Sequence, residues 1–190
     1  MVDDDRTAGL VLAAGAGSRY GRPKILVDDW LTGAVQALHA GGCGSVAVVT
    51  GAARPALPGG VVEIHCPAWR RGIGASLRAG LTAVGSDADR VVVHLVDCPD
   101  VGPAVVRRVL DLTGDQLGRA VFSGRPGHPV VLPRGHVSPL LAGLRDVDGA
   151  GPYLRTHPHV DVECGDLASG EDVDVDRAEP SMDSMEGSDP

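Results

Sequence analysis

The most informative segment of the chain is Ala8-Gly-Leu-Val-Leu-Ala-Ala-Gly-Ala-Gly-Ser-Arg-Tyr-Gly-Arg-Pro-Lys24. Its first six residues, 8–13, are aliphatic or glycine and predict a buried strand, and the glycines that follow predict a loop. Residues 31–40 then have the pattern of a helix. A strand, a glycine-rich loop and a helix in this order are typical of the start of an α/β domain.

The glycine-rich loop has the composition of a phosphate-binding loop. Glycines let the backbone approach a ligand closely and let its N–H groups converge on phosphate oxygens, and Arg19 and Lys24 add positive charge at the same place. Two better-known phosphate loops do not fit, because the dinucleotide pattern GxGxxG requires glycine at Tyr20 and the Walker pattern requires Gly-Lys-Ser/Thr, whereas Lys24 follows Pro23. An ordinary surface turn would explain the glycines but not the two cations. We therefore expect a nucleoside triphosphate here.

Strand and helix patterns continue to alternate after this segment. The further predicted strands are Ser45–Thr50, Val61–His65 and Arg90–Val96, and the helices between and after them are Ala75–Val84 and Ala104–Leu112. This alternation indicates βαβ crossovers and a mostly parallel sheet. Apolar residues make up 43% of the chain and aromatics only 3%, which suits buried parallel strands better than an aromatic-rich β-sandwich.

The second half of the chain is less regular. Two strands, Ala120–Ser123 and Pro129–Leu132, can pair around Gly124–Gly127, and two short helices are expected at Val137–Leu144 and Ala150–Thr156. A length of 190 residues suits one domain, which we place at residues 1–180. Residues 181–190 have no periodicity and predict a disordered acidic tail.

Several classes of protein are disfavoured by what the sequence lacks. A signal peptide and an apolar run of about 18 residues are both missing, so we expect a cytoplasmic protein without membrane contact. The four cysteines lie far apart, without zinc spacing, and are interpreted as small buried hydrophobic residues; they are Cys43, Cys66, Cys98 and Cys164.

The net charge of −8 is unevenly distributed. From Asp161 onward there are eleven Asp/Glu and one Arg, a net of −10, which leaves residues 1–160 at +2. The body of the protein is thus compatible with a phosphate-bearing ligand. No basic stripe suggests a nucleic-acid partner.

Three further sequence blocks follow the loop in order. They are Cys66-Pro-Ala-Trp-Arg-Arg-Gly-Ile-Gly-Ala-Ser76-Leu-Arg-Ala-Gly-Leu81, Val96-Asp97-Cys98-Pro99 and Gly127-His128-Pro129-Val130. Together with the loop, over about residues 8–176, they resemble the nucleotidyltransferases that include the molybdenum cofactor cytidylyltransferases and guanylyltransferases. This resemblance implies a three-layer α/β sandwich with a mostly parallel sheet, the Rossmann-like nucleotidyltransferase fold.

The resemblance also implies a reaction. The acceptor phosphate of molybdopterin attacks the α-phosphorus of a magnesium-bound NTP, and pyrophosphate leaves without a covalent enzyme intermediate. The opening Ala13-Ala14-Gly15, where guanylyl-transferring relatives usually have Ala-Gly-Gly, favours CTP as the donor. A recipient molybdoenzyme is a further implied partner.

Two aspartates are the candidate Mg²⁺ ligands. Asp97 follows an apolar run and should lie at the carboxyl end of a central strand, where open α/β sheets bind ligands. A strand-end aspartate is also a common helix cap, a role that Asp100 could fill instead. Mg²⁺ needs more oxygen ligands, and Asp174 is our choice for the second acid, with Asp172 as the alternative. These late acids could equally belong to a solvated tail.

The remaining site residues are assigned by the resemblance. Arg19, Lys24 and Asp97 are the expected catalytic residues, because phosphoryl-type transfer depends on positioning and charge stabilisation. His128 is assigned to the substrate pocket, although it could be an ordinary hydrogen-bonded residue. The expected nucleotide-binding residues are Leu12, Ala13, Ala14, Gly15, Gly17 and Ser76.

One block departs from the family pattern. Residues 146–152, Asp-Val-Asp-Gly-Ala-Gly-Pro, lack the arginine expected there, which leaves the acceptor open. A transferase for a sugar phosphate or another phosphorylated small molecule is one alternative. A noncatalytic molybdopterin-cofactor-binding chaperone is another, and a nicotinamide oxidoreductase is disfavoured by the loop spacing.

Overall fold

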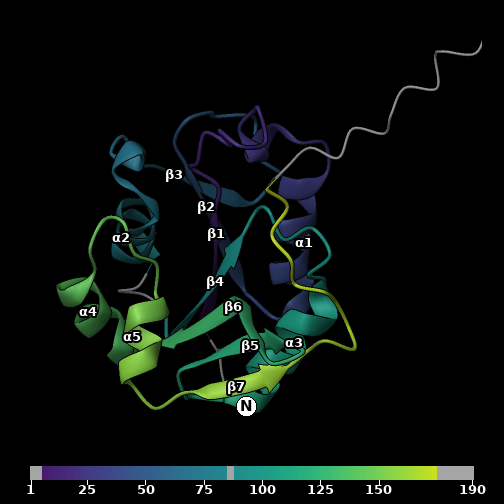
Figure 1. Cartoon of the computed structure of the whole chain (residues 1–190), viewed down its shortest axis with the longest axis vertical. Coiled ribbons are helices and arrows are strands. Elements are labelled where there is room, and N and C mark those ends of the chain that lie inside the picture. Colours follow the sequence, from purple (N-terminus) through teal and green to yellow (C-terminus); the bar gives the residue numbers. More distant parts are fainter. Residues whose placement is uncertain (1–5, 85–87, 175–190) are drawn as a thin grey trace, which may run out of the picture.

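The computed structural model describes residues 6–84 and 88–174 (Figure 1). Its strands are β1 (Thr7–Leu12), β2 (Ser45–Thr50), β3 (Val61–His65), β4 (Arg90–Leu95), β5 (Gly118–Phe122), β6 (Arg125–Pro133) and β7 (Val160–Glu163). They form one seven-stranded sheet in the order β3-β2-β1-β4-β6-β5-β7. Within this sheet β6 is antiparallel to both of its neighbours and the other pairs are parallel. The predicted, mostly parallel sheet is confirmed.

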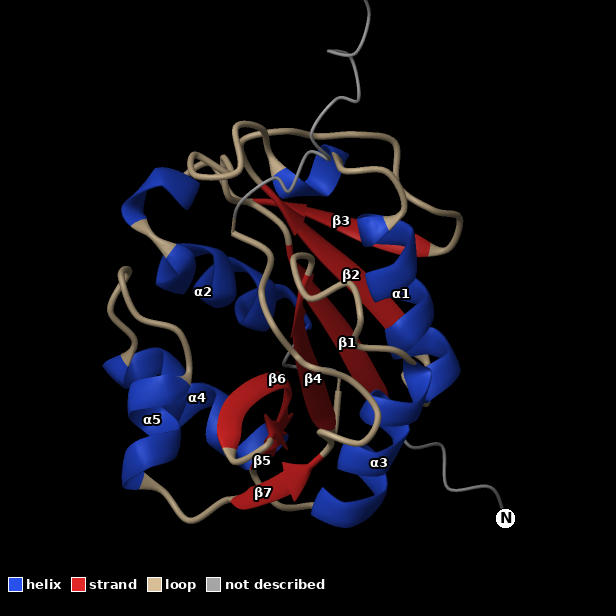
Figure 2. Ribbon diagram, turned by 45° about the vertical axis from the view of Figure 1, so that its right-hand side comes forward, coloured by secondary structure: helices blue, strands red, loops and turns tan. Residues whose placement is uncertain are grey.

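Helices cover both faces of the sheet, which completes the predicted three-layer sandwich (Figure 2). The helices are α1 (Trp30–Gly41), α2 (Ile73–Val84), α3 (Pro103–Thr113), α4 (Arg134–Gly143) and α5 (Gly151–Thr156), with short 3₁₀ turns η1 (Lys24–Leu26) and η2 (Trp69–Arg71). Helices α1 and α3 pack on one face, and α2, α4 and α5 lie on the other.

The central strand β1 explains why the first apolar run is continuous. Leu10 and Leu12 face the core on the α2 side, whereas Val11 between them faces the core on the α1 side. Successive side chains of a strand point to opposite faces, so a strand covered on both sides needs apolar residues throughout. All six residues of β1 are buried.

The structure differs from the sequence prediction mainly in its second half. Strand β7 was not predicted, and α4 begins at Arg134 rather than at Val137. Most of the Gly124–Gly127 segment, expected as the turn between two strands, lies inside β6 because the β5–β6 hairpin turns earlier, at residues 123–124. The predicted tail at 181–190 lies outside the described residues.

Two further expectations concern the interior and the membrane. All four cysteines are buried and none forms a disulfide, as predicted for small hydrophobic residues. Within the described ranges, no helix is long and apolar enough to cross a membrane.

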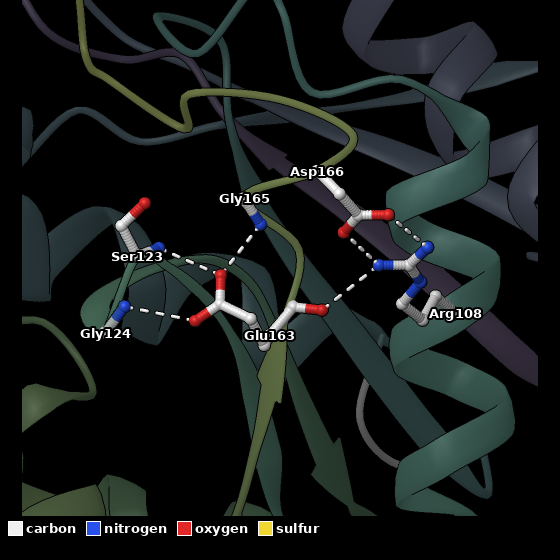
Figure 3. Close-up of polar contacts among 6 residues, drawn as sticks. All are labelled: Arg108, Ser123, Gly124, Glu163, Gly165 and Asp166. Carbon is white, nitrogen blue, oxygen red and sulfur yellow. Dashed lines mark hydrogen bonds and ion pairs between the residues drawn. The ribbon is translucent and has the colours of Figure 1, made fainter.

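A polar cluster fastens the end of β7 to the rest of the domain (Figure 3). The carboxylate of Glu163 accepts hydrogen bonds from the backbone N–H groups of Ser123 at 2.8 Å, Gly124 at 3.1 Å and Gly165 at 2.8 Å. Beside it, Arg108 of α3 binds both carboxylate oxygens of Asp166 and the carbonyl of Glu163. The chain therefore leaves β7 from a fixed point and continues toward the carboxyl ends of the central strands.

Candidate functional site

The glycine-rich loop follows β1 directly and is tied to its neighbours by backbone hydrogen bonds. Ala13 N–H donates to the carbonyl of Val49, and the carbonyl of Ala14 accepts from Ala52. Gly17 has a φ of +61°, and a Cβ there would lie 1.9 Å from the carbonyl oxygen of Arg22, so only glycine fits this turn. A Cβ on Gly15 would meet nothing within 4 Å, which leaves open space beside the loop.

Lys24 lies at the end of this loop and bridges two carboxylates from distant parts of the chain. Its Nζ is 2.8 Å from Oδ2 of Asp97 and 2.9 Å from Oδ1 of Asp174. The other oxygen of Asp174 accepts from Nη1 of Arg19 at 2.9 Å. The two cations predicted for phosphate binding and the two acids predicted for Mg²⁺ thus form one cluster.

The protonation states of this cluster follow from its contacts. Burial alone would lower the pKa of Lys24, but its hydrogen bonds to Asp97 and Asp174 outweigh burial and raise the pKa above its usual value. The hydrogen bond from Lys24 lowers the pKa of Asp174. Lys24 is therefore a cation and Asp174 an anion at neutral pH.

Asp97 has the features of a metal ligand. It follows β4, and its Oδ1 is buried without a hydrogen-bond partner among the described residues. A buried carboxylate oxygen without a partner is costly, and a cation would satisfy it. No group of three or more His, Cys, Asp or Glu side chains in the described ranges could hold a metal. The pair Asp97 and Asp174 suits Mg²⁺, which commonly takes one or two carboxylates together with waters and substrate phosphates.

A cavity of about 540 Å³ opens over the cluster and is large enough for a small organic ligand. The predicted residues that line it include all those expected to bind nucleotide or metal or to act in catalysis: Leu12, Ala13, Ala14, Gly15, Gly17, Arg19, Lys24, Ser76, Asp97 and Asp174. These residues come from β1, its loop, α2, the end of β4 and the C-terminal segment. The carboxyl ends of the central parallel strands thus adjoin the cavity, as they do in other open α/β sheets.

Some of the residues that line this cavity had no role in the sequence prediction, and two of them carry large polar or aromatic side chains. Trp69 and Arg70 of η2 line it, with the guanidinium carbon of Arg70 4.4 Å from the centroid of the Trp69 ring. The Trp-Arg-Arg-Gly block marked this segment as part of the resemblance. Its place beside the loop depends on the turn before α2, where Gly72 has a φ of +131° and a Cβ would lie 2.3 Å from the carbonyl oxygen of Asp146.

Asp100 holds the segment that carries Asp174. Its Oδ2 accepts hydrogen bonds from Ser169 N–H at 2.6 Å, Ser169 Oγ at 2.7 Å and Gly170 N–H at 3.2 Å. Val173 N–H then donates to the carbonyl of Asp97 at 2.9 Å. The helix-cap alternative for Asp100 is wrong, since the N-cap of α3 is Gly102 and it has no side-chain cap.

The other predicted acids and His128 lie apart from the cluster. Asp172 is exposed and does not line the cavity, and Asp176 lies outside the described residues. His128 lines a second cavity, of about 180 Å³, which shares Leu12 and Ile73 with the first. His128 therefore adjoins the predicted nucleotide site without belonging to it.

A family model described as a MobA-like NTP transferase domain matches residues 9–160, which include the loop, Asp97 and both cavities' strands. The chain belongs to the MobA-like NTP transferase family. The predicted family is confirmed, and with it the prediction of a nucleotidyltransferase.

Proteins similar to this MobA-like chain include one named as an oxidoreductase and others named only by a gene designation. Nicotine blue oxidoreductase of Paenarthrobacter nicotinovorans is 35% identical in an alignment that covers 88% of this chain and 91% of the relative. Rv0371c of Mycobacterium tuberculosis H37Rv is 28% identical, with a TM-score of 0.72 over 90% of this chain and 93% of that one. A structure of Rv0371c in complex with manganese matches with a TM-score of 0.63 over 84% and 88% of the two chains.

A more distant structure shares the fold alone. The 2-C-methyl-D-erythritol 4-phosphate cytidylyltransferase of Thermus thermophilus is 20% identical, with a TM-score of 0.61 over 87% of this chain and 91% of that one. The MobA-like chain thus has a nucleotidyltransferase fold. The fold does not identify the donor or the acceptor, so these must be inferred from the residues of the cavity.

Proposed function

We propose that the protein transfers CMP from CTP to the phosphate of molybdopterin, in the presence of Mg²⁺, with release of pyrophosphate. The carrying observation is the cluster in which Lys24 bridges Asp97 and Asp174 beside a glycine-rich loop. It combines cations for a triphosphate with acids for a divalent metal in one cavity. The choice of CTP rests on the Ala13-Ala14-Gly15 opening, and we expect the enzyme to act in the cytoplasm and to supply a recipient molybdoenzyme.

In the proposed reaction, different residues of the cavity have different roles. In the transfer an acceptor phosphate oxygen forms a bond to the α-phosphorus, and the bond to the bridging oxygen breaks with its electron pair leaving on pyrophosphate. Arg19 and Lys24 would neutralise the charge that builds up on the phosphates. Asp97 and Asp174 would hold Mg²⁺, which supplies further charge neutralisation when bound. Ser76 and the loop residues would orient the nucleotide.

The first test is a thermal-shift panel with Mg²⁺ and CTP, GTP, ATP, UTP or NAD. A ligand present at 100 times its dissociation constant stabilises the folded state by about 2.7 kcal/mol, which raises the melting temperature measurably. We expect the largest magnesium-dependent increase with CTP, followed by pyrophosphate release when molybdopterin is added. If GTP gives the largest increase in melting temperature, GTP replaces CTP as the donor. Tight CTP binding with no pyrophosphate release would favour the noncatalytic chaperone.

An alternative acceptor is tested in the same assay. Pyrophosphate released only with a sugar phosphate, or with another phosphorylated small molecule, would keep the nucleotidyl transfer and replace molybdopterin. The absence of an arginine from residues 146–152 motivates this comparison.

A second candidate function comes from the 35% identity to nicotine blue oxidoreductase. If this chain shares that activity, it should oxidise or reduce nicotine blue with a nicotinamide cofactor, and the panel should respond to NAD. We expect neither result, because the loop spacing fits a triphosphate rather than a dinucleotide. Redox turnover of the dye together with silence toward every NTP would overturn the proposed transfer.

A further inference from the structure

The glycine-rich loop ends in a tight turn whose tip carries Arg19 and Tyr20. The turn is closed by a hydrogen bond of 2.8 Å from Gly21 N–H to the carbonyl of Gly17, and these two glycines have positive φ, +90° and +61° respectively. The carbonyl oxygen of Arg22 lies so close to Gly17 that a Cβ there would meet it at 1.9 Å. The turn is therefore a compact unit, and a contact that holds Tyr20 also limits the position of Arg19.

Tyr20 connects this turn to the body of the domain. Its ring lies against the ring of Trp30, the first residue of α1, with centroids 5.4 Å apart and planes tilted by 59°. Tilted aromatic rings at this separation attract one another through their opposite edge and face charges as well as through the surface that they bury. Trp30 is half-buried and packs against the core on the α1 face of the sheet. The Tyr20–Trp30 pair thus ties the tip of the turn to a helix.

The side chain of Arg19 is only weakly held by its own contacts. It is 80% exposed, and its ion pair with Asp174, at 2.9 Å between Nη1 and Oδ2, lies at the surface. Exposed ion pairs contribute little, because their modest Coulomb energy is offset by the cost in side-chain entropy. In the proposed reaction Asp174 would also bind Mg²⁺, so this pair cannot by itself direct Arg19 to the phosphates. The turn must therefore set the position of the Arg19 backbone.

We propose that Tyr20 is a positioning residue of the nucleotide site: by packing on Trp30 it holds the turn so that Arg19 faces the phosphates. The inference rests on the proposed function, since it requires a triphosphate in the first cavity. Arg19 lines that cavity and Tyr20 does not, so Tyr20 acts through Arg19 rather than by touching the ligand. The aromatic ring carries this role, and the hydroxyl group is dispensable.

Inorganic tripolyphosphate is the probe, because it tests the contact to phosphate without a base or an acceptor. In isothermal titration calorimetry of the full chain with Mg²⁺, Tyr20→Phe should bind tripolyphosphate as tightly as the wild type. Tyr20→Ala should bind it about two- to tenfold more weakly, the range expected when one aromatic pair is lost. Equal affinity in Tyr20→Ala and the wild type would overturn the proposal. Weakened binding by Tyr20→Phe would overturn it as well, since the hydroxyl group would then be responsible.

A double-mutant cycle shows whether Tyr20 acts through Arg19. In an Arg19→Met background, Tyr20→Ala should cause no further loss of tripolyphosphate affinity, whereas two independent losses would add. Additive losses would refute the positioning role. Tyr153→Ala is the matched control, because Tyr153 also stacks on a neighbouring ring, that of His157 with centroids 3.8 Å apart, and does not line the first cavity. It should lower the melting temperature and leave the affinity for tripolyphosphate unchanged.

Turnover separates this inference from the proposed transfer. In a pyrophosphate-release assay Tyr20→Ala should have a lower kcat than the wild type and Tyr20→Phe the same kcat, because a displaced Arg19 stabilises the developing charge less well. Tripolyphosphate binding that depends on Tyr20, without pyrophosphate release from any NTP, would keep the positioning role and remove the transfer. Wild-type kcat and KM in Tyr20→Ala would keep the transfer and remove the positioning role. A wild type that binds no tripolyphosphate up to millimolar concentration would overturn both.

Discussion

At the scale of single residues, Lys24 has two effects that can be separated. It neutralises Asp97 and Asp174 in the ligand-free protein, and in the proposed reaction it neutralises phosphate. Lys24→Met should reduce transfer by about 10²–10³-fold, the usual cost of removing one group that stabilises transition-state charge. It should also lower the melting temperature without Mg²⁺, because two adjacent carboxylates lose their shared cation.

Added Mg²⁺ distinguishes these two effects of Lys24→Met. The metal should restore much of the melting temperature but not the turnover, since it replaces the cation between the acids and not the contact to phosphate. Turnover equal to that of the wild type would exclude Lys24 from the reaction. Differential scanning fluorimetry with and without Mg²⁺, beside a pyrophosphate-release assay, makes both measurements.

The choice between Asp174 and Asp172 is a second prediction at this scale. Asp174→Asn should raise the Mg²⁺ concentration required for half-maximal transfer at least about tenfold, because the carboxylate beside Lys24 loses its charge. Asp172→Asn is the matched control: it lies two residues away on the same segment, is exposed and does not line the cavity. A magnesium titration of both variants decides between them, and the reverse ranking would assign the metal to Asp172.

Site residues could be predicted from the sequence where they belong to one contiguous motif. Arg19 and Lys24 lie on one contiguous loop, so their charge and spacing could be interpreted directly. Arg119 belongs to a short strand, and only the fold places it in the lining of the same cavity as His128. No local pattern indicated that these two residues share a cavity.

At the scale of elements, the predictions held where a strand was mostly aliphatic. Strands β1, β2 and β4 are mostly apolar and are covered by helices on both faces, and the apolar pattern was enough to find them. Strand β7 has four residues, of which only Val162 is buried, and it is stabilised by pairing with β5 and by the contacts of Glu163. Such non-local contacts leave little trace in a sequence pattern.

The segment after β7 gives a prediction about positioning. Asp100→Ala removes three hydrogen bonds to Ser169 and Gly170, so the chain that carries Asp174 is held less firmly. We expect the Mg²⁺ requirement for transfer to rise several-fold while transfer at saturating Mg²⁺ stays near that of the wild type. Asp100 would then act through Asp174, as a positioning residue.

Glu163→Gln supplies the control for Asp100→Ala. It weakens the anchor of the same segment farther from the site, at the β5–β6 turn, and should lower the melting temperature without changing the Mg²⁺ requirement (Figure 3). A rise in the Mg²⁺ requirement in both variants would mean that any loosening of the segment has this effect. An unchanged requirement in Asp100→Ala would remove its positioning role.

At the scale of the whole molecule, the aliphatic composition and the sheet order explain why the fold was predictable and the acceptor was not. Parallel strands with helices on both faces need apolar residues throughout, and the sequence supplies them in order. The second cavity, which His128 lines, lies where the reversed strand β6 joins the parallel half of the sheet. Its residues come from both halves of the chain, so its chemistry emerges only after the halves have been brought together.

A buried histidine in the central sheet makes the stability of the molecule depend on pH. His94 of β4 is fully buried, and neither ring nitrogen has a partner among the described residues. Burial, with a smaller effect from His128, lowers its pKa from 6.5 to about 3. Between these two pH values the unfolded chain binds the proton and the folded protein does not, so stability falls as the pH is lowered from about 6.5 toward 3.

His94→Leu removes this proton linkage and replaces unpartnered nitrogens by apolar atoms, so the variant should be at least as stable as the wild type at pH 7. Between pH 6.5 and 4.5 the wild type should lose roughly 2–3 kcal/mol more unfolding free energy than the variant, at about 1.36 kcal/mol per pH unit. Urea unfolding at the two pH values measures the difference, and the carboxylates, which are common to both proteins, cancel. Equal losses in the two proteins would show that His94 is not kept neutral by the fold, and that the interior around β4 admits water or a counter-charge.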